Sequence, residues 1–271
     1  MPRLYVDTNK FIGFYRSGLE PLVIFEELTK YSDYLVTTLQ TTKEFHRNRV
    51  SVLEHLIHQF RESTEVKMPC GTSILKDLPL HKELVALVKD YRDKAAKVVD
   101  FLKEVIQDEG KDQVANKFSA LFAGAKVIKY EITDEIIQRA QKRKLLGNPP
   151  TSTDKHSIGD EVAWEALLQN LNDDLIIVTE DRTYLNNAFL LKEEFNAKTG
   201  KELLLITERF HVGIAALGQV PSKELVKEEE AFEEELRIRY DLSLESPHCH
   251  AYNEWIGSKC MVCGRVSHPL E

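Results

Sequence analysis

The hydrophobic pattern of the chain predicts a parallel sheet. Short apolar runs lie at residues 4–6, 34–38, 175–179 and 203–206, and a weaker candidate lies within 126–132. Continuous apolar runs of this length are typical of parallel strands that are covered on both faces. We therefore expect four or five strands in one sheet.

Helical patterns fill the intervals between the predicted strands. They cover residues 25–31, 41–60, 81–122, 134–144 and 158–171. Stretches with glycine and proline, at 69–79 and 147–150, stop the helices that precede them. The alternation of strands and helices predicts a doubly wound α/β sandwich.

The longest helical pattern, at residues 81–122, carries an apolar stripe at helical spacing. The stripe consists of Leu84, Leu87, Val88, Tyr91, Ala95, Val98, Leu102, Val105 and Ile106. Such a stripe predicts a helical hairpin packed on the core. Helix-rich insertions can also shape a substrate channel, and the sequence leaves this alternative open.

Length and local composition indicate how the chain divides. With 271 residues, of which 42% are hydrophobic, it can form one large domain or one domain with an appendage. Glutamate is frequent at residues 220–235, which predicts a charged helix with a solvated face. We expect a main domain at 1–219 with a helical insertion at 46–125, a linker helix at 220–245 and a tail at 246–271.

The net charge of −8 counts against a uniformly basic surface for nucleic acid. Local groups hold phosphates, however, and basic side chains remain available. They are Arg47, Arg49, Lys142, Arg143, Lys144 and Lys155. No apolar run is long enough to span a membrane, and the first residues lack the apolar region of a signal peptide. We therefore expect a cytosolic protein without a membrane partner.

Four carboxylates are candidates for a single site. They are Asp7 and Asp181, each just after a predicted strand, Glu44 after the second strand, and Asp160 at a helix start. Taken singly, the aspartates could be turn residues or helix caps, and the glutamate could lie on the surface. Together they favour a metal site, because parallel strands end at one edge and clustered carboxylates repel one another. Oxygen ligands of this kind suit Mg²⁺ or Mn²⁺.

The order of these acids resembles the motifs of PIN domains. Residues 5–9, Tyr-Val-Asp-Thr-Asn, resemble the first motif, and residues 37–45 resemble the second, with Glu44 in the acidic place. Residues 178–181, Val-Thr-Glu-Asp, resemble the last motif. The first and last motifs are short, so the order of all the motifs carries the resemblance.

A second group of residues resembles a bacterial PIN-like subgroup. Asn-Pro-Pro at 148–150 is followed by Ile-Gly-Asp at 158–160 and Trp-Glu at 164–165, with Asp160 in the third acidic place. The resemblance spans residues 3–210. It implies a three-layer α/β/α sandwich and a phosphodiester hydrolase that usually acts on RNA. Two ions about 4 Å apart could activate a water and stabilise the leaving oxygen.

The resemblance also implies roles for neighbouring side chains. Thr8 or Asn9 would orient the carboxylate of Asp7 or a bound water. Thr179 would do the same beside Asp181.

Three further side chains are auxiliary candidates. Glu161 and Glu180 would be additional acids, and Arg182 would meet a scissile phosphate, although it could equally be a surface arginine. The long helical stretch is a departure from small PIN toxins. Their substrates and partners therefore transfer less directly to this chain.

Cysteine and histidine are concentrated near the end of the sequence. A Cys-x₂-Cys pair followed by glycine is a common half of a zinc knuckle. The candidate ligands are Cys249, Cys260 and Cys263 with one of His248, His250 and His268. We expect a structural Zn²⁺ in this tail, and the alternative is a loose tail whose thiols bind nothing.

The sequence therefore predicts a metal-dependent nuclease with RNA as its first candidate substrate. Its setting could be RNA turnover, a toxin or defence against phage, and a protein partner could regulate it. Two alternatives remain, a DNA or flap-type nuclease on the same fold and an inactive binding or scaffold module. We do not expect a nucleotide-driven motor, since the sequence has neither G-x-x-x-x-G-K-S/T nor G-x-G-x-x-G.

Overall fold

The structure is a computed structural model that describes residues 1–16, 20–152, 157–243, 255–256 and 259–260. The chain divides into two compact units, Met1–Pro221 and Ser222–Glu271. No helix among the described residues is long and apolar enough to cross a membrane.

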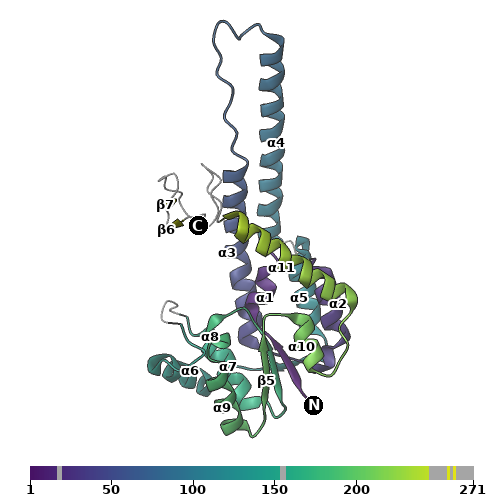
Figure 1. The fold of residues 1–271 in the computed structure, drawn as a ribbon, viewed down its shortest axis with the longest axis vertical. Helices are drawn as coiled ribbons and strands as arrows, with labels where there is room; N and C mark the ends of the chain where they lie inside the picture. Colours follow the sequence, from purple (N-terminus) through teal and green to yellow (C-terminus); the bar gives the residue numbers. More distant parts are fainter. Residues whose placement is uncertain (17–19, 153–156, 244–254, 257–258, 261–271) are drawn as a thin grey trace. The chain divides into compact units, whose positions relative to one another are not determined.

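The first unit is built on a parallel sheet (Figure 1). Its strands are β1 (Arg3–Val6), β2 (Leu35–Thr38), β3 (Ile128–Tyr130), β4 (Leu175–Val178) and β5 (Leu203–Thr207). They lie in the order β3-β2-β1-β4-β5, and every neighbouring pair is parallel. The predicted α/β class with a parallel sheet is confirmed, and all five predicted strands are present.

Helices cover both faces of this sheet. In chain order they are α1 (Thr8–Gly13), α2 (Pro21–Lys30), α3 (Leu39–Ser63), α4 (Pro79–Gln107), α5 (Gln113–Ala123), α6 (Asp134–Leu146), α7 (Gly159–Asn170), α8 (Arg182–Leu185), α9 (Ala188–Thr199) and α10 (Phe210–Ala216). On one face, Tyr5 and Ile177 pack with Trp164 of α7 and Phe195 of α9. Successive side chains of a strand alternate between faces, so Leu4 of β1 and Ile176 and Val178 of β4 face the opposite layer.

Helix α10 approaches the opposite face closely because it carries a glycine. A Cβ atom on Gly213 would lie 2.7 Å from Val178 Cγ2 and 3.3 Å from Leu4 Cδ1. Phenylalanines from α1, α2, α5 and α10 extend this layer through ring contacts. They are Phe11, Phe25, Phe118, Phe122 and Phe210, joined by Phe14. The two layers enclose the sheet as the three-layer fold requires.

Helices α3 and α4 form a long hairpin that extends from the sheet (Figure 1). The predicted helical stretch over 81–122 is helical, but the chain breaks near its end into α4, a short 3₁₀ turn (Glu109–Lys111) and α5. Asp108 accepts the amide of Gly110, and Asp112 accepts the amide of Ala115. These local bonds compete with the helix and start new turns.

Buried polar contacts fix the base of the hairpin. Arg49 of α3 donates to Asp112 Oδ2 at 2.6 Å and to the carbonyl of Val105. The hydroxyl of Tyr15 donates to the same carboxylate at 2.6 Å. Arg49 was expected to be available for phosphate. That expectation is wrong, because its guanidinium is buried in this ion pair.

The apolar stripe of α4 is only partly covered. Val88 and Val105 are buried, whereas Leu84, Leu87 and Tyr91 are exposed. The prediction that the whole stripe packs on the core is therefore wrong for its outer half. Periodicity identifies an apolar face, but it does not say what covers that face.

The second unit contains α11 (Lys223–Ser243) and a two-stranded antiparallel pair, β6 (Trp255–Ile256) and β7 (Lys259–Cys260). Most of the proposed zinc ligands lie outside the described residues. They are His248, Cys249, His250, Cys263 and His268. Only the backbone of Cys260 is described, so the zinc site stays a prediction.

Candidate active site

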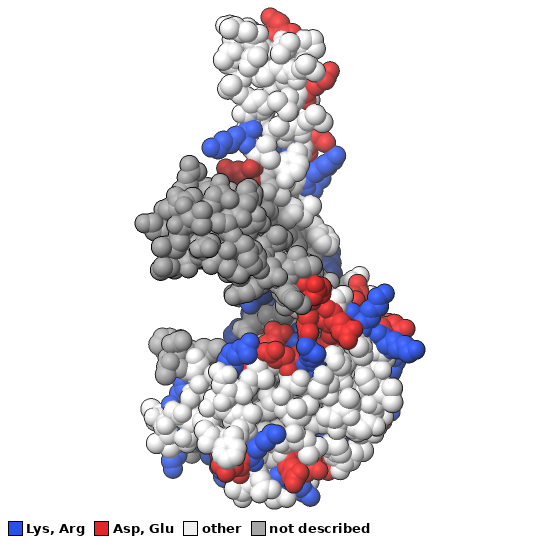
Figure 2. Space-filling model, viewed as in Figure 1, with Lys and Arg blue, Asp and Glu red and all other residues white. Residues whose placement is uncertain are grey.

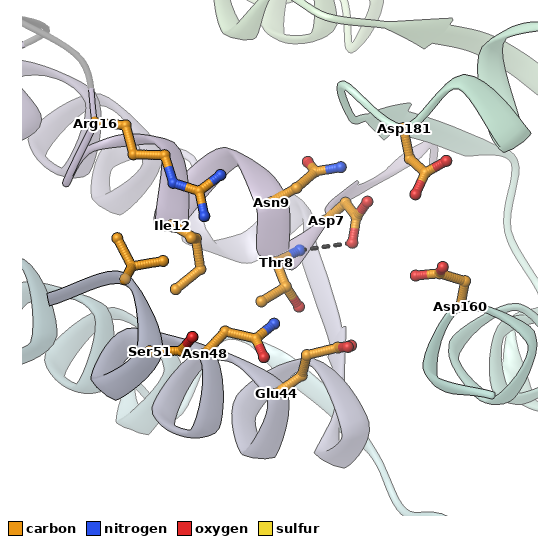
Figure 3. A pocket seen from close by; sticks show the side chains of 11 residues that line it. Asp7, Thr8, Asn9, Ile12, Arg16, Glu44, Asn48, Ser51, Asp160 and Asp181 are labelled. Atoms are coloured by element: carbon orange, nitrogen blue, oxygen red, sulfur yellow. Dashed lines mark hydrogen bonds between the residues drawn. The ribbon is translucent and has the colours of Figure 1, made fainter. Parts of the chain in front are cut away.

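Four carboxylates meet at the carboxyl edge of the sheet. Asp7 follows β1, Asp181 follows β4, Glu44 lies in the second turn of α3, and Asp160 lies in the first turn of α7. All four line one cavity of about 290 Å³ (Figure 3). Four segments that are far apart in sequence thus contribute to one acidic wall.

Asp7 is held by hydrogen bonds to both oxygens of its carboxylate. It caps α1, where Oδ1 accepts the amide of Thr8 at 2.7 Å. Oδ2 accepts the hydroxyl of Thr179 at 2.7 Å. Thr8 therefore contacts this carboxylate through its backbone, and its hydroxyl donates to the carbonyl of Thr41. The carboxylate has little freedom to rotate.

The hydroxyl of Thr179 connects the ends of β1 and β4. Besides donating to Asp7, it accepts the amide of Asp181 at 2.9 Å and the side-chain amide of Asn9 at 3.2 Å. Asn9 in turn accepts the backbone amide of Glu180 at 3.3 Å. Thr179 is fully buried. One hydroxyl thus sets the distance between two of the acidic segments.

The four carboxylates give the cavity a strongly negative electrostatic potential. The pKa of the Asp7 carboxyl is raised to about 7, first by burial and then by the negative charges of Asp160, Asp181 and Glu44. The hydrogen bond from Thr179 acts in the opposite direction. A cation in the cavity would remove the repulsion that raises this pKa.

Glu44 approaches the start of α7 because residue 159 is glycine. A Cβ atom on Gly159 would lie 2.9 Å from Glu44 Oε1 and 3.0 Å from Oε2. The same atom would lie 3.1 Å from the side-chain nitrogen of Gln40. Gly159 therefore makes room for one carboxylate beside another, that of Asp160. Glu44 Oε1 also accepts the guanidinium of exposed Arg47 at 3.1 Å.

The other end of the cavity differs in chemistry. It is lined by Ile12 of α1, by Arg16 just after α1, and by Asn48, Ser51 and Val52 of α3. Figure 3 shows Arg16 and Ser51 at the end away from Asp160 and Asp181. Sequence reasoning missed these residues. The signal was available, since positions 48 and 51 follow Glu44 at helical spacing on one face of α3.

The three auxiliary candidates, Glu161, Glu180 and Arg182, do not line this cavity. Glu180 accepts Lys10 Nζ at 2.6 Å. Buried Glu161 accepts the hydroxyl of Thr151 at 2.5 Å. Arg182 is 75% exposed and contacts Glu208 at 3.4 Å. These three side chains are engaged in other contacts.

A buried ion-pair network positions α7, which carries Asp160. Arg143 of α6 donates to Glu165 of α7 at 2.5 Å and to Glu194 of α9 at 2.6 Å. It also donates to the carbonyl of Pro149, and the indole of Trp164 donates to Glu194. Arg143 was expected to be available for phosphate. That expectation is wrong, because the side chain is buried between helices.

The donor set of the cavity fits a hard divalent cation. All four acids offer oxygen, and Asp7, Asp160 and Asp181 lie around one gap at the same end of the cavity in Figure 3. Within the described residues, no three histidine, cysteine or acidic side chains already form a finished metal-binding group. Carboxylates that repel one another stay apart, and a bound cation would draw them inward.

Comparison with known families gives one match. A family model described as a PIN domain matches residues 4–184. This range contains all four carboxylates and the loop before α7. No curated protein and no solved structure matches the chain.

Proposed function

Because this chain belongs to the PIN domain family, we propose that it is a metal-dependent endoribonuclease. The family has a nuclease-type fold and typically depends on a metal. The observation that carries the proposal is the cavity in which Asp7, Glu44, Asp160 and Asp181 meet.

In this proposal, the four carboxylates hold one or two Mg²⁺ or Mn²⁺ ions. When bound, such ions polarise a water and the scissile phosphate and stabilise the leaving oxygen. The chain supplies the positioning. Thr179 and the amide of Thr8 fix the Asp7 carboxylate, and Gly159 lets Glu44 stand beside the start of α7.

The far end of the cavity would receive the substrate strand. Arg16 offers a guanidinium that can pair with a phosphate next to the scissile one. Asn48 and Ser51 offer hydrogen bonds to ribose or base, and Ile12 offers an apolar contact. The order of these groups defines a path for the strand through the cavity, between the acidic end and Arg16.

Cleavage of end-labelled single-stranded RNA and matched DNA in Mn²⁺ tests the proposal, with wild type compared against Asp160→Asn. We expect wild type to cut RNA and the variant to lose at least about a hundredfold in rate. Asp134→Asn is the matched control, because Asp134 is an exposed carboxylate in the first turn of α6. The control should cut at the wild-type rate.

The other outcomes lead to different functions. Cutting of DNA alone would indicate a DNA or flap-type nuclease. No cutting of either substrate, together with no binding of Mn²⁺, would indicate a binding or scaffold module. No cutting despite Mn²⁺ binding would indicate a nuclease that requires a partner protein. Equal cutting by wild type and Asp160→Asn would refute the assigned site.

For the rest of the chain, we propose a nuclease domain at residues 1–219, a linker helix at 220–245 and a Zn²⁺-binding tail at 246–271. Cys249, Cys260 and Cys263 would supply three thiolates, and a histidine would supply the fourth ligand. Structural zinc folds segments that are too short for a core of their own. A chelator should therefore make the tail sensitive to protease while the main domain stays resistant.

A further inference from the structure

The outer face of α4 carries a row of exposed apolar side chains. Their exposed fractions lie between 42% and 70%. The row consists of Leu80, Leu84, Leu87, Tyr91, Val98 and Phe101. Figure 2 shows that the end of the hairpin farthest from the sheet presents mostly uncharged surface on the visible face. Large apolar patches are uncommon on the surface of monomeric proteins, so a row of this kind indicates a binding surface.

The spacing of this row is that of a helix-pairing seam. Steps of four and three residues alternate from position 80 to position 101, with Lys94 completing the series. This period of 3.5 residues keeps one face toward a partner helix over its whole length. The row spans about 30 Å at 1.5 Å per residue. A straight partner helix of similar length would cover it.

A neighbouring face of the same helix is already occupied. Val88, Val99 and Val105 are buried, and α4 packs along α3. Helix α4 therefore has two adjacent apolar seams, of which the hairpin covers one. Helices with two such seams belong to bundles of more than two helices.

Charges beside the exposed row favour antiparallel pairing of identical helices. The first half of the row is flanked by Glu83 and Asp90, and the second half contains Lys94 and Lys97. Asp90 and Lys94 form an ion pair at 2.8 Å on the same helix. In an antiparallel pair centred on the row, Glu83 of each helix lies opposite Lys97 of the other. A parallel pair would not bring these two charges together.

From these observations we infer that the exposed row of α4 binds α4 of a second copy of this chain, antiparallel. The two α4 helices then pack against each other along their exposed rows. A self-complementary surface of this kind closes with twofold symmetry. The inference does not depend on the nuclease proposal, because none of the residues in the row lines the acidic cavity.

Sedimentation velocity of the full chain, from low to high micromolar concentration, tests the inference. We expect wild type to show a monomer–dimer equilibrium. The double variant Leu84→Glu, Leu87→Glu should weaken dimerisation by on the order of a hundredfold or more. Both leucines are exposed, so the variant should fold, and its far-UV circular dichroism should match wild type.

The matched control is the double variant Leu145→Glu, Leu146→Glu. These leucines are also exposed, at 86% and 63%, and the substitutions change the net charge equally, but they lie on α6. The control should dimerise as wild type does. The inference would be overturned if wild type stayed monomeric at every concentration. It would also be overturned if the Leu84→Glu, Leu87→Glu variant dimerised as wild type does.

Charge reversal tests the antiparallel direction. Glu83→Lys or Lys97→Glu alone should weaken dimerisation by roughly three- to tenfold, since each places like charges opposite one another. Both substitutions in one chain should restore it, because the antiparallel pair then has opposite charges again. If the combined variant is no better than the single ones, the antiparallel pairing is wrong.

Discussion

The acidic edge of the sheet and the outer face of α4 are both unfavourable arrangements in an isolated chain, but for different physical reasons. At the sheet edge, like charges stand together in a partly buried cavity. On α4, large apolar side chains stand in water. A cation would relieve the first and a second apolar surface the second. Sulfate should therefore weaken cation binding in the acidic cavity, because it screens charge. It should strengthen association through the outer face of α4, because it favours burial of apolar surface.

The largest difference should come from Asp7→Asn, which removes one charge from the acidic cavity. Activity should fall by on the order of a hundredfold or more, because an oxygen ligand of the proposed ions is lost. Stability should change in the opposite direction when no divalent ion is present. The variant should be more stable than wild type at pH 8 by about 1–3 kcal/mol.

The sign follows from the pKa of Asp7, which is raised from its ordinary value to about 7. The native state holds this proton more tightly than the unfolded state, so wild type loses stability as the pH rises through about 4 to 7. Urea unfolding with chelator at pH 5 and pH 8 measures the effect. The free energy of unfolding of wild type should fall between pH 5 and pH 8 by more than that of the variant. Equal changes in the two proteins would show that the raised pKa of Asp7 is not the cause.

A smaller effect is expected from Gly159→Ala. Its new Cβ atom would lie within 3.0 Å of both carboxylate oxygens of Glu44, so that side chain must move away from Asp160. Affinity for Mn²⁺ should fall by about 10- to 100-fold, as for other groups that position metal ligands. Isothermal titration calorimetry measures this. Gly147→Ala is not a suitable control, because Gly147 has a positive φ of 69°.

A better control for this experiment is Gly13→Ala. No atom lies within 4 Å of the position that its Cβ would occupy, and its φ is not positive. Metal affinity should be unchanged in this variant. An equal loss of affinity in both variants would show that the effect does not come from the contact with Glu44.

The smallest effect is expected for the monomer stability of Leu84→Glu, Leu87→Glu. These side chains contribute little to the isolated chain because they are exposed, so the free energy of unfolding should change by less than about 0.5 kcal/mol per substitution. Urea unfolding at a concentration where wild type is monomeric measures it. A loss of several kcal/mol would show that this face of α4 is buried within a single chain.

Parallel strands explain why the acidic site could be located from sequence. Asp7 and Asp181 follow apolar runs, and the ends of parallel strands necessarily share an edge. The direction of neighbouring side chains was not predictable in this way. Glu180 follows the same strand as Asp181 but pairs with Lys10, because its orientation depends on the turn that begins α8.

Other features depend on contacts that no local pattern contains. Arg143 lies in a basic run that is typical of a solvated helix end, but Glu165 and Glu194 from two other helices enclose it. Arg49 is paired in the same way with Asp112, far along the chain. For α4, the pattern gave the apolar face but not its partner.

Helix α3 has a mechanical consequence, because it carries Glu44 near one end and the hairpin at the other. Arg49, bound to Asp112, anchors the helix between them and acts as a pivot. At 1.5 Å per residue, Glu44 lies about 7.5 Å from this pivot and Ser63 lies about 21 Å from it on the other side. A sideways displacement of the far end therefore reaches Glu44 reduced about threefold by these lengths. Movements of the hairpin should therefore reach Glu44 only as smaller displacements, so the carboxylates can keep their spacing while the hairpin shifts.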